Sequence, residues 1–137
     1  MARFSKSIKF LSEAEIIAVN EEMVSKYGGL HGVKDLNLLG SSVGRPQITV
    51  GFQDAYKTIF DKAAALFHSI INNHPFLDGN KRTSLFSAIL FLEYNGWTVT
   101  MKRKEAVKFT RQVHNQRYTV EQISEWLQNH SRKISPR

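Results

Sequence analysis

Hydrophobic residues recur at helical spacing along most of the chain, and the flanking polar residues mark where the helices start and stop. Ser12 and Glu15 have the spacing of a capping box, so a helix is predicted over residues 13–27, ending at the glycine that follows. Asp35 has the character of an N-cap for a second, short helix that runs to Val43 and ends before the next proline.

Two longer segments are apolar around most of their circumference, which is typical of helices buried in the centre of a domain. The first is expected to begin at Asp54 and to reach Asn73, and the second covers residues 80–94 and ends at Asn95-Gly96, a glycine C-cap. Their apolar positions are Ile59, Ala63, Leu66, Phe67, Ile70 and Ile71 in the first helix, and Leu85, Phe86, Ile89, Leu90 and Leu92 in the second.

Two short segments have β-type patterns instead. Residues 48–50 are Ile-Thr-Val and precede Gly51, which favours a brief extended or hairpin piece between the second and third helices; an ordinary connecting loop is the alternative. Residues 97–101 alternate large apolar side chains with threonine, which predicts another brief strand.

The C-terminal part completes the pattern. Helices are predicted at 105–115 and 120–130, the second opened by a capping box of Thr119 and Gln122, and the tail 131–137 is expected to fray. Six helices in 137 residues, 42% of them hydrophobic, can bury one sizeable core and leave no room for another. We therefore expect an all-α fold in which residues 1–137 form a single compact domain.

Charge is distributed unevenly along this pattern. Nine Lys or Arg and only three Glu follow Met101, so +6 of the net charge of +7 lies in the last 36 residues. Such a basic third favours, as one reading, a small helical module that binds nucleic-acid phosphates without chemistry. The basic residues are not interleaved with aromatic ones, however, and that reading leaves His74 and Asp78 without a role, so nucleic acid is not expected to be a direct partner.

Composition also limits the compartment and the kinds of site. The chain has no cysteine, which excludes disulfides and thiolate metal sites. It has no signal-like N-terminus and no run approaching the roughly 18 apolar residues that span a bilayer. A cytoplasmic protein without membrane contact is expected.

The segment His74–Thr83 carries the candidate chemistry. It places a base, a carboxylate, a glycine and two adjacent cations directly before an apolar helix. Lys81 and Arg82 fall in the first helical turn, where free N–H groups and the helix dipole already favour negative charge, so cations there are unfavourable unless an anion binds. Such an anion would meet amides, a lysine and a guanidinium together, and this predicts a phosphate site.

His74 and Asp78 suggest what happens at that phosphate. His74 precedes a proline, which ends the preceding helix and leaves the imidazole on a loop, where it can accept a proton from a hydroxyl near neutral pH. Asp78 offers oxygen ligands suited to the Mg²⁺ that accompanies nucleotide phosphates. Taken singly, Asp78 has a simpler reading as a helix cap, and the two cations as a solvated face. Together the groups indicate phosphoryl or nucleotidyl transfer.

The same segment resembles the signature of the Fic/Doc superfamily, which is His-Pro-Phe, two variable residues, Gly-Asn-Gly-Arg, two variable residues and Arg. Lys81 stands where the second glycine would be and Leu85 where the second arginine would be, and both departures are typical of the Doc (death on curing) branch. Further stretches similar to Doc-type sequences, in the same order, are 27–33, 38–47, 61–68 and 91–96.

The resemblance implies roles for single residues. His74 would be the general base on a target hydroxyl, Asp78 the Mg²⁺ ligand, and Gly79, Asn80, Lys81 and Arg82 the phosphate cradle, with Lys81 most important for the developing charge.

The departures from the signature bear on the reaction. In Fic enzymes the second glycine lets the backbone approach the α- and β-phosphates of ATP for AMP transfer, and the side chain of Lys81 obstructs that approach. Doc-type members are implied to bind ATP in the reversed sense and to transfer the γ-phosphoryl group. Phe86 replaces an asparagine of some Doc-type members and puts any nucleotide contact of that asparagine in doubt. Phe76 is expected to be a structural plug in the core rather than a catalytic residue.

The family also implies a biological setting. Doc-type proteins are the toxins of toxin–antitoxin pairs, and the activity expected here is ATP-dependent phosphorylation of a threonine of elongation factor Tu, which inhibits translation. No segment matches the inhibitory helix of some Fic proteins, so inhibition is expected from a separate antitoxin chain whose acidic residues meet the basic third. By resemblance, residues 47–52 would be a β-flap that holds a target segment beside the site. A Fic-type AMP transferase and a purely binding member remain as alternatives.

Overall fold

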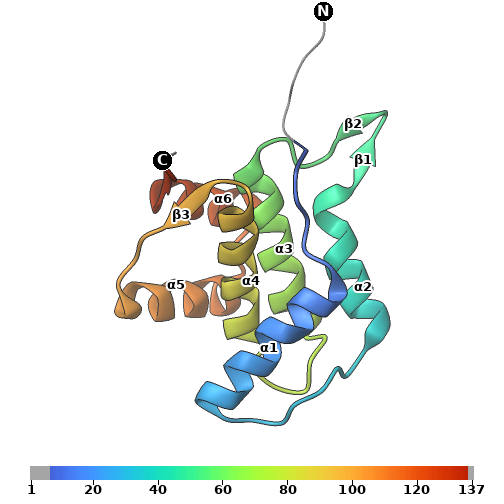
Figure 1. Cartoon of the computed structure of the whole chain (residues 1–137), viewed down its shortest axis with the longest axis vertical. Coiled ribbons are helices and arrows are strands. Elements are labelled where there is room, and N and C mark those ends of the chain that lie inside the picture. Colours follow the sequence, from blue (N-terminus) through green and yellow to red (C-terminus); the bar gives the residue numbers. More distant parts are fainter. Residues whose placement is uncertain (1–6, 136–137) are drawn as a thin grey trace, which may run out of the picture.

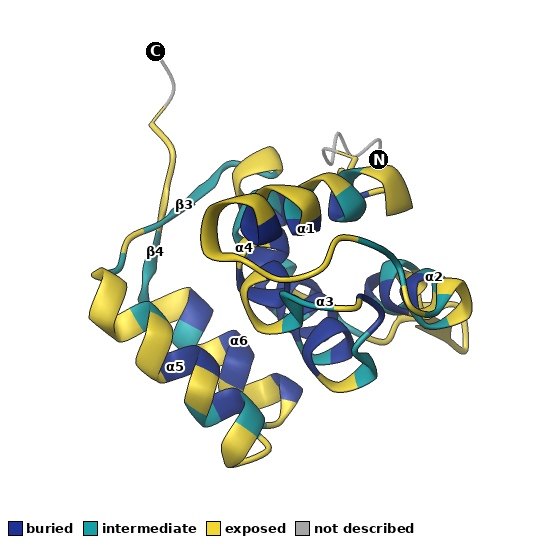
Figure 2. Cartoon of the chain, turned by 90° about the horizontal axis from the view of Figure 1, so that it is seen from below, coloured by how far each residue is buried: buried dark blue, intermediate teal, exposed yellow. Residues whose placement is uncertain are grey.

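Two helices, α3 (Ile59–Asn73) and α4 (Asn80–Tyr94), form the centre of the computed structural model, which describes residues 7–135 (Figure 1). Ten of the fifteen residues of α3 are buried, because three helices, α2, α4 and α6, pack against it. Figure 2 shows this burial concentrated in α3 and α4, whereas the outer helices bury only one side. The prediction of central helices flanking the His74–Thr83 segment is confirmed.

Four more helices and two small antiparallel strand pairs surround this centre. α1 packs against α4. The helices α5 and α6 lie together at the C-terminal side. None of the described helices is long and apolar enough to cross a membrane. The predicted all-α fold of six helices is confirmed. The remaining elements are α1 (Glu13–Tyr27), α2 (Leu36–Gly44), η1 (Arg45–Gln47), β1 (Thr49–Val50), β2 (Gln53–Asp54), β3 (Trp97–Val99), α5 (Arg103–Asn115), α6 (Val120–Asn129) and β4 (Ser131–Lys133).

The helix starts that the sequence marked with capping residues are found where predicted. Ser12 and Glu15 form a capping box on α1, and Thr119 forms another with Gln122 on α6. The side chain of Asp35 accepts the N–H of Leu38 and so caps α2. Each of these bonds satisfies an amide that the first helical turn leaves without a partner.

The start of the central helix differs from the prediction. α3 begins at Ile59 rather than at Asp54, because Thr58 and Asp61 form a capping box that fixes its first turn. Asp54 lies in β2 and accepts a 3.0 Å hydrogen bond from the ammonium of Lys62, which is only 2% exposed. This ion pair ties the β1–β2 hairpin to the beginning of α3.

The tail also differs from the prediction over part of its length. Residues 131–133 do not fray but form β4, which pairs antiparallel with β3. Backbone hydrogen bonds from Thr100 N–H to the His130 carbonyl and from Ile134 N–H to the Gly96 carbonyl extend this pairing at both ends. The pairing depends on a partner more than 30 positions away, so local composition did not reveal it. Residues 136 and 137 lie outside the described part of the chain.

The β1–β2 hairpin is confirmed as a short β element, but it is not near His74. The hairpin precedes the first turn of α3, whereas His74 follows the last turn, and Figure 1 places them at opposite ends of this helix. Fifteen residues of α-helix span about 22 Å. Residues 47–52 therefore do not lie beside the motif, and the expectation that they hold a target segment there was wrong.

Candidate active site at the α3–α4 connection

His74 ends α3 in an unusual backbone conformation. Its φ of 50° and ψ of 58° are in the left-handed region, and its N–H donates to the Ile70 carbonyl. The proline that follows was expected to force extended backbone here, so the end of the helix is as predicted but its conformation is not. A non-glycine residue held at positive φ stores strain, and such strain is concentrated at functional sites.

The connection after His74 is held by two of the side chains that follow it. Phe76 is 1% exposed and fills the core, as expected of a structural plug. The Asn80 side chain accepts the Phe76 N–H at 3.0 Å and donates to the Phe76 carbonyl at 2.9 Å. Both functional groups of this amide therefore brace the loop, and Asn80 has its backbone N–H and the second N–H of its side-chain amide left for a phosphate.

A second loop, residues 28–35 between α1 and α2, lies along the first. Val33 forms an isolated antiparallel bridge with Phe76, and the Leu77 N–H donates to the Gly32 carbonyl. The Pro75 carbonyl accepts the N–H groups of residues 34 and 35 at 2.7 and 3.2 Å. This loop, rather than the β1–β2 hairpin, is the extended segment beside the motif.

Asp78 is oriented by this second loop and does not cap the helix. Its Oδ2 accepts the Leu30 N–H at 2.6 Å, and the cap position of α4 is taken by Gly79, at φ 77°. Asn20, 1% exposed, donates to the Asp78 carbonyl at 2.8 Å and so holds the backbone as well. Oδ1 has no hydrogen-bond partner among residues 7–135 and is the oxygen left for a ligand.

The first turn of α4 combines open amides with cations. No side chain caps it, so the N–H groups of residues 80–82 lack the partners that a helix start requires. The side chains of Lys81 and Arg82 are exposed at this end. The arrangement matches the predicted phosphate site in charge and in free donors.

A pocket of about 540 Å³ adjoins this turn, and most of its lining residues come from α1, α4 and α5. On one wall the guanidiniums of Arg82 and Arg103 lie 4.1 and 6.0 Å from the centre of the Tyr27 ring. No carboxylate is among the lining residues, which include four cations and several apolar side chains. They are Tyr27, Lys81, Arg82, Leu85, Phe86, Met101, Arg103, Ala106, Val107, Thr110 and Arg111.

His74 is surrounded by groups that disfavour its protonation. Burial lowers the pKa of the His74 imidazole, and His114, Lys34 and Lys81 lower this pKa further by repulsion. The neutral imidazole, which is the form that accepts protons, is therefore the dominant one at neutral pH.

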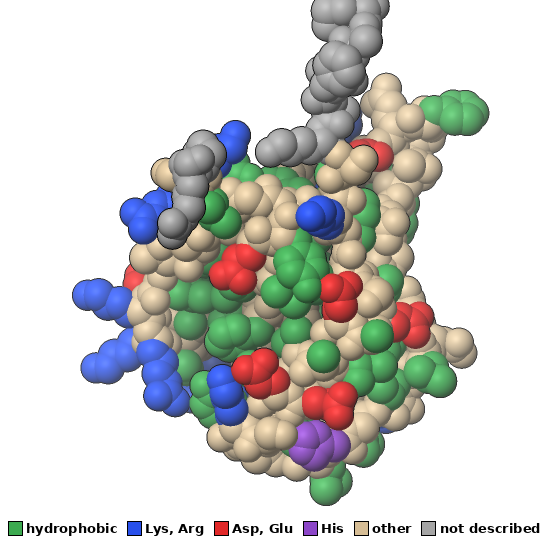
Figure 3. All heavy atoms as spheres, viewed as in Figure 1, with side chains coloured by type: hydrophobic (Ala, Val, Ile, Leu, Met, Phe, Trp, Pro, Cys, Tyr) green, Lys and Arg blue, Asp and Glu red, His purple; other side chains and the backbone are tan. Residues whose placement is uncertain are grey.

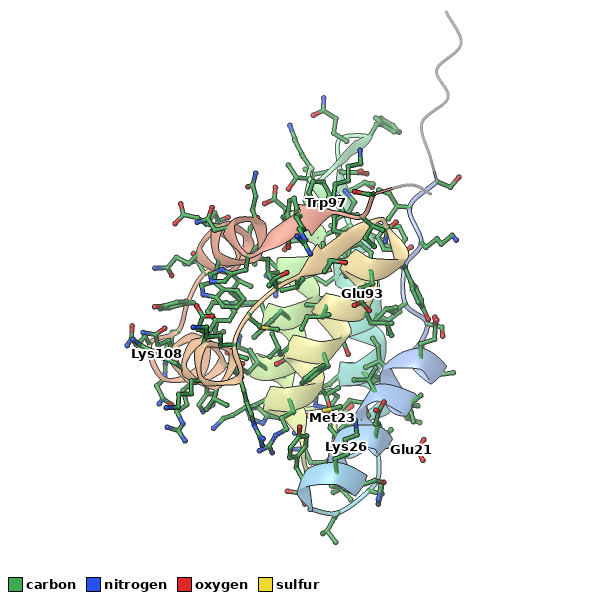
Figure 4. The ribbon with its side chains drawn as sticks, turned by 60° about the vertical axis from the view of Figure 1, so that its left-hand side comes forward. Glu21, Met23, Lys26, Glu93, Trp97 and Lys108 are labelled. Atoms are coloured by element: carbon green, nitrogen blue, oxygen red, sulfur yellow. The ribbon has the colours of Figure 1, made fainter. Side chains whose placement is uncertain are left out.

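Several cations of the basic third lie on α5, and two of them, Arg103 and Arg111, also line the pocket beside the motif. Figure 3 shows Lys and Arg side chains gathered along the edge that α5 and the C-terminal segment form, and Figure 4 shows Lys108 projecting outward from α5. A shallow groove of about 480 Å³ follows this face, with Arg103, Lys104, Lys108 and Arg111 in its lining. Among residues 7–135, no group of three or more His, Cys, Asp or Glu is placed to hold a metal.

The structure thus brings together His74, Asp78, Gly79, Lys81 and Arg82, as the sequence predicted. It adds three features for which no role was predicted: the 28–35 loop on Asp78, the cation–π contacts of Arg82 and Arg103 with the Tyr27 ring, and His114 beside His74. The glycine-rich stretch after Tyr27 was the sequence signal that could have revealed the 28–35 loop. His114 carried no signal, because its neighbour is 40 positions away.

Comparison with known proteins agrees with this geometry. The sequence profile of the Fic/DOC family matches residues 10–92. "Protein kinase doc" of Escherichia phage P1 is 36% identical over 89 residues, which are 65% of this chain and 70% of that protein. "Toxin Doc" of Mycolicibacterium smegmatis is 50% identical over 70 residues, which are 51% of this chain and about half, 54%, of that protein. The chain belongs to the Fic/DOC family, in its Doc toxin branch.

Proposed function

We propose that this protein transfers the γ-phosphoryl group of ATP to a hydroxyl of a protein target. The observation that carries the proposal is the position of a predominantly neutral histidine beside an uncapped helix start with two cations. A base and a polyanion site on adjoining turns are what a phosphoryl transfer requires, because positioning and charge neutralisation supply most of the catalysis.

The proposed phosphoryl transfer forms one bond to the γ-phosphorus and breaks another. The target hydroxyl loses its proton to the His74 imidazole while its oxygen bonds to the γ-phosphorus, and the bond from that phosphorus to the β–γ bridging oxygen breaks, releasing ADP. Lys81, Arg82 and the amides of residues 79–82 stabilise the negative charge on the phosphoryl oxygens.

Asp78 is the residue that we assign to Mg²⁺. Its free Oδ1 fits an ion that takes one or two carboxylates and completes its shell with phosphates and waters, so a single acidic side chain suffices. Bound there, Mg²⁺ would neutralise charge on the phosphates of ATP.

The pocket beside α4 suits the rest of the nucleotide. Lys81 and Arg82 belong both to the proposed phosphate site and to the pocket lining, so one molecule can occupy both. Beyond them, Phe86 and the apolar side chains offer surface for a base, and Arg103 and Arg111 add positive charge without any carboxylate in opposition. We therefore propose ATP rather than a single phosphate group as the ligand.

Elongation factor Tu, through one of its threonines, is the proposed target. The test incubates the protein with purified elongation factor Tu, ATP and Mg²⁺ and measures the intact mass of the products. A gain of about 80 Da, one phosphoryl group, supports the proposal. A gain of about 329 Da, one AMP, would show that Lys81 does not prevent the Fic-type ATP orientation. An unchanged mass would exclude this target, and the assay would then be repeated with labelled ATP in a cell lysate to find another phosphorylated protein.

The 28–35 loop gives a prediction about Asp78. Gly29 has φ 117°, and a Cβ built on it would lie 2.8 Å from the Asp78 Cβ, closer than real contacts allow. Gly29→Ala should therefore displace the carboxylate and reduce Mg²⁺-dependent transfer by about 10- to 100-fold, measured as initial rates across a Mg²⁺ titration.

Gly28→Ala is the matched control for this substitution. Gly28 also has a positive φ, 95°, but a Cβ there meets nothing within 4 Å. Both variants carry the backbone strain of alanine at positive φ, and only Gly29→Ala disturbs Asp78. Equal rates in the two variants would mean that the position of the Asp78 carboxylate does not matter for the reaction.

We further propose that a separate antitoxin chain inhibits the protein by binding across the basic face of α5 with acidic residues of an amphipathic tail. The support is the concentration of exposed cations along one helix, which favours a partner of opposite charge. Co-expression with the product of a neighbouring small gene is expected to restore growth. Charge reversal at Lys104 and Lys108 together should weaken this rescue, and an unaltered rescue would place the antitoxin elsewhere.

A further inference from the structure

The ring of His114 lies against the ring of His74. The two ring centroids are 5.9 Å apart, and the planes meet at 75°, an edge-to-face arrangement. His114 lies in the last turn of α5, whereas His74 ends α3, so two separate elements deliver the rings to one place. Neither ring takes part in a hydrogen bond among residues 7–135; the histidine rings that do are those of His68 and His130.

Side-chain packing in the core gives α5 a fixed position relative to His74. Phe109, five residues before His114, is 1% exposed and packs edge-to-face on Phe67 of α3, with ring centroids 5.6 Å apart. Its other face stacks on Trp126 of α6 at 3.9 Å. Val113, next to His114, is also buried. His114 is therefore presented from a helix anchored in the core rather than from a mobile loop.

A catalytic base needs an orienting contact, and within the described residues 7–135 the His74 ring has no hydrogen-bonded one. A half-exposed imidazole without a partner can occupy several side-chain rotamers, and only some of them point a ring nitrogen at the acceptor hydroxyl. Bases in other enzymes are commonly oriented by a third group. The aromatic ring that contacts His74 is that of His114, so the orienting function falls to it.

We propose that His114 is a positioning residue for the proposed reaction: its ring packs against the His74 imidazole and holds it in the orientation that accepts the proton of the target hydroxyl. This inference rests on the proposed function, in which His74 is the base. It adds to that function a component that the Doc signature does not contain, because His114 lies outside residues 74–83 and outside the matched residues 10–92.

His114 also affects the pKa of the His74 imidazole. Three groups face the imidazole from three elements: Lys34 from the loop before α2, Lys81 from α4 and His114 from α5, and each lowers the pKa of His74. Burial is the largest cause of the lowered pKa of His74, and the repulsion from His114 comes next. Removing the His114 imidazole should therefore raise the pKa of His74.

Two substitutions separate packing from charge. His114→Phe keeps an aromatic ring and removes the imidazole nitrogens, whereas His114→Gln removes the ring. The His74 ring resonances are followed by NMR across a pH titration, and kcat and KM for ATP are measured with elongation factor Tu. His114→Gln should lower kcat about tenfold with little change in KM, because the base is misplaced and the nucleotide site is not. His114→Phe should recover most of kcat.

In both variants the titration midpoint of His74 should rise toward that of an ordinary histidine, because one repulsive neighbour is gone. A midpoint unchanged in both variants, or a His114→Phe variant as slow as His114→Gln, would overturn the proposal. The NMR titration needs no substrate. If the wild-type protein phosphorylates nothing, the proposed function fails, and the titration still decides whether the two rings are coupled.

Discussion

His74→Asn is expected to reduce phosphoryl transfer by about 10²- to 10⁴-fold, the range in which general bases contribute. Asparagine is chosen because it tolerates left-handed backbone better than other residues, so the strained end of α3 is retained. The substitution removes the proton acceptor and leaves the phosphate site intact. The rate is measured with elongation factor Tu under saturating ATP, where a loss in kcat with little change in the KM for ATP is expected.

His68→Asn provides the comparison for this loss. His68 also belongs to α3, and burial and Arg45 lower its pKa, but its Nδ1 accepts a 2.7 Å hydrogen bond from Arg45 and is not free to take a proton from a target. The variant should keep its transfer rate to within a few fold of wild type. If His74→Asn retained more than a tenth of the wild-type activity while both variants remained folded by circular dichroism, His74 would not be the base.

Lys81→Ala is expected to reduce kcat by about 10²- to 10³-fold, as is found when one donor to a developing charge is removed. The ammonium lies at an open helix start, where the first-turn amides cannot replace it as a mobile point charge. Lys81→Arg should recover only part of the activity, because a guanidinium presents its charge as a wider, planar fork. Initial rates and product masses would be measured for all three proteins.

Removal of Lys81 also tests which group of ATP is transferred. The lysine is expected to obstruct the ATP orientation used for AMP transfer. If the alanine variant transferred AMP and the wild type did not, Lys81 would determine which group is transferred as well as stabilise negative charge. Lys9→Ala is the control, since Lys9 contacts Asn95 only through its backbone groups at the far end of α4. A similar loss in Lys9→Ala would mean that the effect is one of net charge.

The sequence was sufficient for the features that depend on neighbouring residues. Capping boxes at Ser12 and Thr119 and the cap at Asp35 fixed three helix starts, because each bonds to an amide three positions ahead. The bounds of α4 followed from its apolar run and from Asn95-Gly96. The grouping of His74, Asp78 and Lys81 followed from their closeness in the chain.

Features that depend on distant segments were not accessible in this way. The β3–β4 pairing, the 28–35 loop along the motif and the contact of His114 with His74 each join residues more than 30 positions apart. The start of α3 was misplaced for a different reason: Asp54 and Thr58 are both acceptable caps, and only the Lys62 ion pair and the Asp61 capping box decide between them. The conformation of His74 contradicts the usual effect of a following proline, so no local rule gives it.

The proposed site is assembled from three segments that are far apart in the chain: the 28–35 loop, the turn from His74 to Arg82, and the end of α5 at His114. Proteins are synthesised from the N-terminus, and contacts between distant segments form late. A chain still attached to the ribosome and lacking α5 would have neither the complete pocket, which α5 helps to line, nor the His114 contact. On the proposed function, a protein that attacks translation would thus remain inactive while translation is producing it.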